Sequence, residues 1–179
     1  IKSLFSIMEY LSSSRPMVLA INKVHMAPYG VMQLINYMMT TLGIENDISY
    51  RFSKWDPENT EKYINDPAAW ERTESLMRNI LNHLEINYEE AVGEAAFYGP
   101  KLDVQVKPAV GNEITVSTCQ IDFCLPAKFE LTYVDSNGEK QTPVMVHRAV
   151  LGSYERFLVL LLEQFKGVLP VWLSPVQVN

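Results

Sequence analysis

The chain has 179 residues, of which 47% are hydrophobic and 20% are charged, and its formal net charge is −6 at pH 7. These values are typical of one soluble globular domain, or one and a half at most, so they exclude a disordered chain and argue against a generally basic nucleic-acid surface. No apolar run reaches the roughly 20 residues that a bilayer requires, and no signal-peptide pattern opens the sequence, so we expect no membrane association.

Residues 1–11 carry apolar side chains at helical spacing and predict a helix. Residues 17–26 read as a strand, and the run 27–30, which contains proline and glycine, predicts a turn after it. His25 lies in this strand, where a histidine satisfied inside the fold is the expected role.

Residues 31–42 predict a second helix, because apolar side chains recur on one face and Gly43 suits its C-terminal cap. A strand over 48–52 and a polar loop over 53–60 follow. Asp66 and Pro67 form a cap followed by a first-turn proline, so a third helix is expected from there to about Leu84. We expect His83 at the edge of the buried face of this helix.

The pattern then changes to short strands separated by turn signals, with the strands expected over residues 88–92, 102–107, 114–123, 129–134 and 144–150. Successive strands with short links predict an antiparallel sheet, and the helices that precede them must pack on it. The predicted fold class is therefore α+β, an antiparallel sheet flanked by helices.

Cys119 and Cys124 are the only cysteines, too few for a disulfide framework. On a strand, their spacing would place them on opposite faces, which also argues against a shared metal ion. Two reduced thiols in the core of a cytoplasmic protein are expected.

A strand that runs directly into a helix forms residues 144–165, with Gly152 and Ser153 as its polar hinge. Ser153 suits the N-cap of this helix, which is apolar on all sides and should be buried. Arg156 falls in the first turn, where the helix dipole disfavours a cation by a few tenths to about 1 kcal/mol. Two explanations stay open: Arg156 binds an anion at the helix N-terminus, or it pairs with a carboxylate such as Glu155 or Glu163.

Residues 152–157, Gly-Ser-Tyr-Glu-Arg-Phe, resemble motif 3 of the class II aminoacyl-tRNA synthetases. The lead-in 143–149 narrows the resemblance to the threonyl-tRNA synthetase family, as do residues 96–103 and 120–126, in the same order and spacing. The likeness runs from about residue 50 to 177. It implies the C-terminal part of a class II catalytic core, in an enzyme that activates threonine with ATP and Mg²⁺ and passes it to tRNA(Thr).

By this resemblance, Arg156 is the catalytic motif 3 arginine that lies along the adenine and the γ-phosphate of ATP. Ser153 caps its helix and is also an expected ATP contact. Tyr98, Lys101 and Gln120 match positions that line the substrate pocket. Without the resemblance, the Tyr98 segment would read as an ordinary loop.

His147 resembles one of three protein ligands of the Zn²⁺ ion that selects threonine by its amino and hydroxyl groups. The other two ligands of the family, a cysteine and a second histidine, have no matching positions in this sequence, so bound zinc is not expected for this chain by itself. A further departure is Thr115, which stands where many members carry a glutamine that contacts the substrates.

Motif 2, whose arginine holds the α-phosphate, has no counterpart, because Arg51 matches the segment that follows it. The expected divisions are a poorly matching part over 1–50, a partial catalytic core over 51–167 and, over 168–179, a linker toward an anticodon-binding domain. Three hypotheses follow: a piece of a homodimeric, cytoplasmic threonine–tRNA ligase, inactive alone; a truncated, non-catalytic paralogue that serves as a binding or regulatory module; or a structural fragment that binds nothing.

Overall fold

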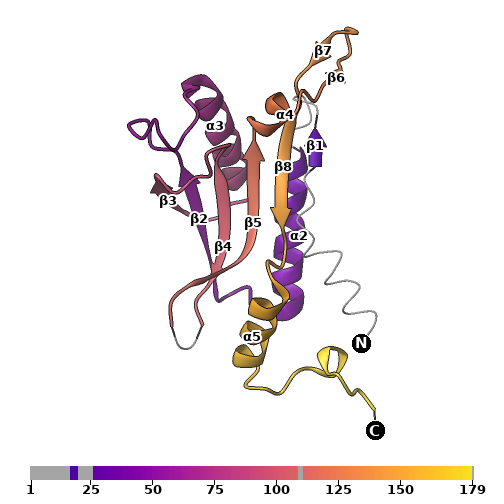
Figure 1. Cartoon of the computed structure of the whole chain (residues 1–179). Helices are drawn as coiled ribbons and strands as arrows, with labels where there is room; N and C mark the ends of the chain where they lie inside the picture. Colours follow the sequence, from indigo (N-terminus) through magenta and orange to yellow (C-terminus); the bar gives the residue numbers. More distant parts are fainter. Residues whose placement is uncertain (1–16, 20–25, 109–110, 179) are drawn as a thin grey trace.

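The computed structural model describes all residues except 1–16, 20–25, 109–110 and 179 (Figure 1). The predicted first helix and His25 lie outside the described residues. In chain order the elements are β1 Met17–Leu19, α2 Met26–Leu42, β2 Ile48–Lys54, α3 Pro67–His83, β3 Glu89–Val92, β4 Lys101–Val106, β5 Ile114–Asp122, α4 Leu125–Lys128, β6 Tyr133–Val134, β7 Lys140–Gln141, β8 Val144–Ala149, α5 Tyr154–Gln164 and the 3-10 helix η2 Val171–Leu173. Within this part of the chain, no helix is both long and apolar enough to span a bilayer.

Six strands form one sheet in the order β1-β8-β5-β4-β2-β3, and β6 pairs with β7 in a separate two-stranded ribbon. Neighbours in the large sheet are antiparallel except for β2 and β3, which are parallel. The α+β prediction is confirmed. Parallel pairing of β3 was not expected, and it arises because α3 carries the chain back across the sheet before β3 begins.

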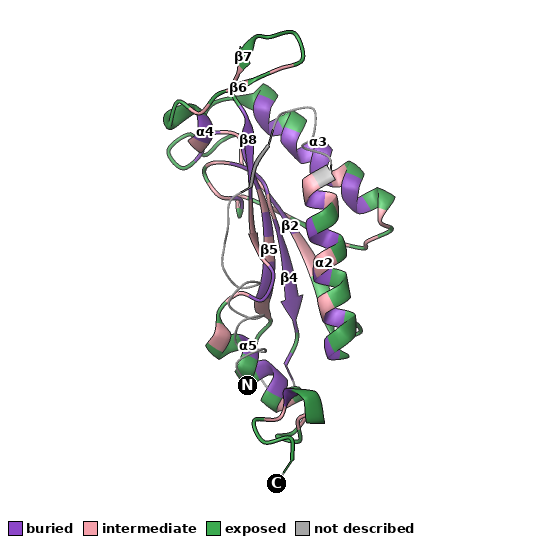
Figure 2. Cartoon of the chain, turned by 90° about the vertical axis from the view of Figure 1, so that its right-hand side faces the viewer, coloured by how far each residue is buried: buried purple, intermediate pink, exposed green. Residues whose placement is uncertain are grey.

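Helices α2 and α3 lie on the same side of the large sheet (Figures 1 and 2). Side chains alternate between the two faces of a strand, and the inward set of each central strand is apolar. These inward residues pack with α2 and α3 in one core, whose fully buried members include Met32, Ile35, Met39, Phe52, Met77, Leu102, Val104, Cys119, Ile121 and Val146. The opposite set of each strand is therefore free to carry polar side chains.

Helix α2 begins at Met26, so the predicted turn over 27–30 is wrong. Pro28 lies in the first turn, where backbone N–H groups have no helical partner, so the missing donor costs nothing. The C-terminal end is as predicted: Gly43 has a φ of 68°, and the N–H groups of Gly43 and Ile44 donate to the carbonyls of Thr40 and Met39.

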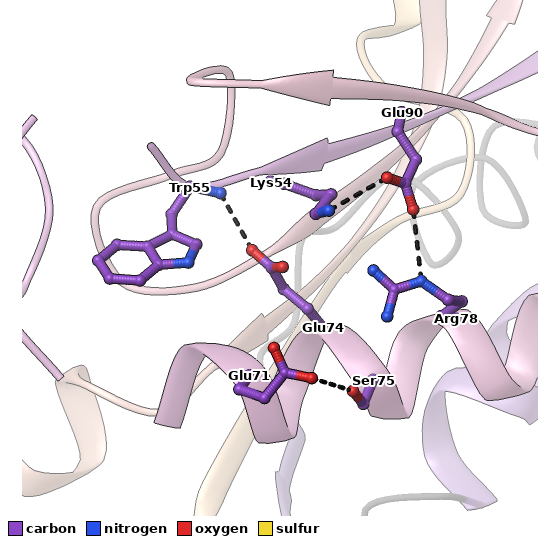
Figure 3. A network of polar contacts seen from close by, with 7 residues as sticks. All are labelled: Lys54, Trp55, Glu71, Glu74, Ser75, Arg78 and Glu90. Carbon is purple, nitrogen blue, oxygen red and sulfur yellow. Dashed lines mark hydrogen bonds and ion pairs between the residues drawn. The ribbon is translucent and has the colours of Figure 1, made fainter. Parts of the chain in front are cut away.

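Helix α3 begins as predicted, with Asp66 accepting a hydrogen bond from the N–H of Ala69. Its buried Trp70 stacks on Trp55 at 5.3 Å, which fastens the end of β2 to the helix. A polar network does the same on the neighbouring turns (Figure 3): Glu74 accepts from the N–H of Trp55, and Glu90 on β3 pairs with Lys54 and with Arg78.

The predicted strand over 129–134 is mostly wrong, because residues 125–128 form the short helix α4 and only Tyr133 and Val134 are extended. Pro126 lies in the first turn of α4, and Asp122 accepts hydrogen bonds from the N–H groups of Cys124 and Leu125. These bonds turn the chain away from β5 after Asp122, although the apolar pattern of the sequence continues beyond that point.

Helix α5 has the predicted bounds within one residue, and Ser153 is its N-cap residue, but the Ser153 side chain makes no capping hydrogen bond. Burial is confined to Phe157, Leu160 and Leu161. Leu158, Val159 and Leu162 are exposed, to 47%, 58% and 40% respectively, so the prediction of a helix buried on all sides is wrong. The expected domain divisions at residues 50 and 167 stay predictions.

Candidate functional site

The sheet face opposite α2 and α3 carries a row of polar side chains on its three central strands. Leu102, Cys119 and Val146 point into the core, so by alternation their neighbours Lys101, Gln120 and His147 point to the other face. Lys101 lies directly opposite Gln120 on β5, and Gln120 lies directly opposite His147 on β8. Three of the candidate residues from separate parts of the sequence therefore form one cross-strand row.

Tyr98 joins this row from the turn that precedes β4. Its hydroxyl donates to the side-chain oxygen of Gln120 at 2.6 Å, and its ring lies 5.4 Å from the His147 ring. Partial burial, together with the nearby charge of Asp122, raises the pKa of the Tyr98 hydroxyl, while the bond to Gln120 lowers it in part. The phenol is thus kept as a neutral hydrogen-bond donor.

Gly99 allows the Tyr98 turn to lie against β5. A Cβ atom on Gly99 would lie 1.7 Å from the carbonyl oxygen of Ile121, far inside any real contact. Backbone bonds hold the same approach, from Ile121 N–H to Pro100 and from Phe123 N–H to Tyr98. The position of the phenol therefore depends on the absence of a side chain at residue 99.

The Lys101 ammonium is held by an acidic neighbour on the same face. Its Nζ lies 2.7 Å from Oδ2 of Asp103, which is only 5% exposed, and Thr118 donates to the other Asp103 oxygen at 2.9 Å. This chain of contacts continues the polar face along β4 and β5. The sequence had not singled out Asp103 or Thr118, because a lone polar residue in a strand carries no signal of its partners.

Asp122 is a further site residue that the sequence reasoning missed. It is fully buried, and its Oδ2 lies 2.7 Å from Nε2 of His147. Asp122 stands inside the run 120–126 that carried the resemblance, but nothing in that run shows that its carboxylate reaches a histidine 25 residues further along the chain.

Among the described residues, no hydrogen bond or ion pair joins Arg156 or Ser153 to this group. β8 runs toward α5 while β5 runs toward α4, so the start of α5 is at the opposite end of the sheet from Asp122 (Figure 1). Arg156 is exposed and forms no hydrogen bond or ion pair with another described residue. The structure therefore brings Tyr98, Lys101, Gln120 and His147 together, and it places Ser153 and Arg156 at the start of α5, beyond the C-terminal end of β8.

The start of α5 is nevertheless fixed to the central sheet. Gly152 has a φ of 60°, and a Cβ atom there would lie 3.0 Å from the carbonyl oxygen of Val116 on β5. The buried Ser117 hydroxyl donates to the carbonyl of Val150, one turn before the helix. The backbone that presents Arg156 is thus held by the strand that also carries Gln120.

Within the described residues, no group of three His, Cys, Asp or Glu side chains could hold a metal ion. Cys119 is fully buried on the core face, and burial raises the pKa of its thiol to about 12, which leaves it a poor ligand. The contact of His147 with Asp122 is of the kind that a metal-ligating imidazole commonly makes, in which the second ring nitrogen donates to a carboxylate.

Comparisons with known proteins show the family of the chain. The family model described as tRNA synthetase class II core domain (G, H, P, S and T) matches residues 17–165. A threonine–tRNA ligase of Clostridium botulinum is 60% identical over 150 residues, which are 84% of this chain and 23% of that protein.

Two solved structures have similar folds. A structure described as the RNA-binding domain of threonyl-tRNA synthetase from Cryptosporidium parvum is 28% identical, with a TM-score of 0.79 over 89% of this chain and 39% of its own. A putative threonyl-tRNA synthetase of Aeropyrum pernix is 30% identical, with a TM-score of 0.76 over 90% of this chain and 37% of its own. The chain thus spans less than a quarter of the curated relative and under two fifths of either solved chain.

Proposed function

The chain belongs to the class II tRNA synthetase core family and resembles its threonyl members, and from that premise we propose that it is a part of a threonine–tRNA ligase. The whole protein would bind ATP, threonine and tRNA(Thr) in the cytoplasm as a homodimer. It would join the threonine carboxylate to the α-phosphorus of ATP, release pyrophosphate, and then transfer the threonyl group to the terminal ribose of the tRNA with loss of AMP.

One observation carries the proposal: the cross-strand row of Lys101, Gln120 and His147, with Tyr98 bonded above Gln120. These are the residue types, and the positions, that the family resemblance assigns to the amino-acid pocket. In this fold, four side chains from a turn and three strands lie together on one polar face. A chance likeness in sequence would not require these four side chains to lie together.

These residues would position the substrates and neutralise charge, since the reaction passes through no covalent enzyme intermediate. Tyr98 is a neutral donor, and Gln120 offers its amide group beside it. Lys101 brings an ammonium group to the same face, held in place by Asp103. We propose that these three side chains orient the threonine against the nucleotide.

We propose that His147 contributes one ligand to a zinc ion in the whole enzyme. When bound, such an ion would act as a Lewis acid that holds the amino and hydroxyl groups of threonine and so rejects valine. The contact with Asp122 fits this role. The remaining ligands would have to come from outside the described residues.

Arg156 is proposed to bind the nucleotide, with Ser153 beside it at the N-terminus of α5. Its exposure, and its position in a first turn where a cation is disfavoured, support a role toward an anion. A guanidinium both stacks on an adenine ring and bonds a phosphate in a bidentate manner, which lysine does not reproduce.

A second candidate is a non-catalytic paralogue that serves as a binding or regulatory module. It is favoured by the lack of a motif 2 counterpart in the given sequence. Under either proposal, we expect this chain by itself to be inactive.

The test is threonine-dependent exchange of pyrophosphate into ATP by the full-length protein. Arg156→Lys should lower kcat/KM by more than about tenfold, corresponding to a lost charge-assisted contact of about 1.4 kcal/mol or more. The matched control is Arg78→Lys, because Arg78 lies on α3, away from the site, and pairs with Glu90 of β3. Absence of exchange in the full-length protein would support the paralogue, and equal activity of the two variants would remove Arg156 from the site.

A further inference from the structure

Asp122 uses both carboxylate oxygens in three hydrogen bonds, although it is fully buried. Oδ1 accepts from the backbone N–H groups of Cys124 and Leu125, each at 2.9 Å. Oδ2 lies 2.7 Å from Nε2 of His147. One oxygen thus accepts the N–H groups at the turn into helix α4, and the other contacts only the imidazole.

This division has a consequence for the proton on His147. A carboxylate only accepts hydrogen bonds, so the contact with Oδ2 requires the proton of the neutral imidazole to be on Nε2. Nδ1 is then the nitrogen with a free lone pair. The Tyr98 ring, 5.4 Å from the imidazole, packs against it and limits its rotation.

We propose that Asp122 is a positioning residue that fixes the tautomer and the orientation of His147, so that Nδ1 is the nitrogen offered to a metal ion or substrate. This inference rests on the proposed function of His147 as a ligand in the threonine pocket. The turn into α4 needs only Oδ1, whereas Oδ2 makes a charge-assisted contact that has no structural role in the helix.

The substitution Asp122→Asn separates the role of Oδ1 in the turn into α4 from the role of Oδ2 at His147. The two backbone N–H groups require an acceptor, so the asparagine oxygen should take the place of Oδ1 and α4 should form unchanged. The NH₂ group then falls at the position of Oδ2 and donates toward His147. Nε2 must become the acceptor, and the proton should move to Nδ1.

Nitrogen-15 NMR of the histidine side chains in this chain measures the tautomer directly. In spectra of the neutral imidazole, the wild type should show the Nε2–H form of His147 and Asp122→Asn the Nδ1–H form. Exposed His83, on α3, is the internal control and should not change. An Nδ1–H form in the wild type, or the same tautomer in both proteins, would overturn the inference.

A second measurement tests the link to function in the full-length protein. Zinc content and affinity should fall by roughly 10–100-fold in Asp122→Asn, with KM for threonine raised more than KM for ATP. His147→Ala is the reference variant. If His147→Ala keeps its zinc and its threonine activation, the proposed role of His147 fails; if His147→Ala loses both and Asp122→Asn keeps both, the positioning role of Asp122 fails while the proposed function stands.

Discussion

The Tyr98 hydroxyl donates a 2.6 Å hydrogen bond to Gln120, a residue 22 positions further along the chain. The bond joins the turn before β4 to the middle of the row that β4, β5 and β8 form. The bond therefore holds the Tyr98 turn to the cross-strand row. Removing it tests how much it contributes to the stability of the chain.

Tyr98→Phe should destabilise the chain by about 0.5–1.5 kcal/mol, because it removes this bond and keeps the ring against His147. Urea unfolding followed by circular dichroism measures the difference. Tyr37→Phe is the matched control, since Tyr37 is 65% exposed and should change stability by less than about 0.5 kcal/mol. Equal losses in the two variants would mean that the Tyr98 bond contributes nothing.

Gly99→Ala should be far more damaging than its size suggests. The new Cβ atom would lie 1.7 Å from the Ile121 carbonyl oxygen, so the turn must leave β5 or the strand must move, at a cost of about 3 kcal/mol or more. Gly30→Ala is the control, because Gly30 lies in α2 with no atom within 4 Å, and there alanine should stabilise by roughly 0.5–1 kcal/mol. Thermal unfolding should therefore shift in opposite directions for the two variants.

At neutral pH the wild type, with Glu74, should be less stable than the Glu74→Gln variant. Burial raises the pKa of this carboxyl above its ordinary value near 4.5, although the bond from Trp55 and the charges of Lys54 and Arg78 act the other way. A carboxyl with a raised pKa in the folded state destabilises the fold once it ionises, so stability falls as pH rises through that pKa.

Glu74→Gln keeps an acceptor for the Trp55 N–H without the charge. Its advantage over the wild type should be full at neutral pH and vanish below about pH 4.5, as measured by urea unfolding across that range. Glu71→Gln, at an exposed position one turn earlier, controls for loss of a negative charge. A gain that persists at low pH would contradict the burial argument.

Glu90 should show the opposite dependence on pH. Although slight burial acts to raise the pKa of Glu90, its hydrogen bonds and ion pairs with Lys54 and Arg78 lower it overall (Figure 3). The stabilisation is present above its ordinary pKa and is lost as pH falls through the lowered one. Glu90→Gln should cost about 0.2–1 kcal/mol at neutral pH, less at high salt, because these pairs are partly exposed. Glu89→Gln should cost less in the same unfolding experiment, because Glu89 lies on the same edge strand and has no ion pair with another described residue.

Cys119 should resist thiol reagents in the native state, because it is fully buried and its pKa is raised to about 12. Cys124, which is 6% exposed, should react faster than Cys119 in the folded chain. Mass spectrometry after timed alkylation at about pH 8 measures both rates. Alkylation of Cys119 before Cys124, without unfolding, would show that the core around β5 opens more readily than its packing implies.

Local patterns were enough to place much of this fold. The cap formed by Asp66 and Pro67, the glycine after α2 and the apolar periods of the strands each predicted an element that the structure contains. Where the sequence failed, a contact from elsewhere decided the outcome: Asp122 ends the strand pattern by starting α4, and α3 returns the chain so that β3 pairs in parallel.

The amino-acid sequence by itself determined the family resemblance and the identities of Tyr98, Lys101, Gln120 and His147, because residue types at fixed spacing are written along one chain. Only the tertiary structure decided that these four share a face and that a buried carboxylate holds the imidazole. The reason is that strand register brings together residues far apart in sequence, and register depends on the packing of the whole sheet against its helices.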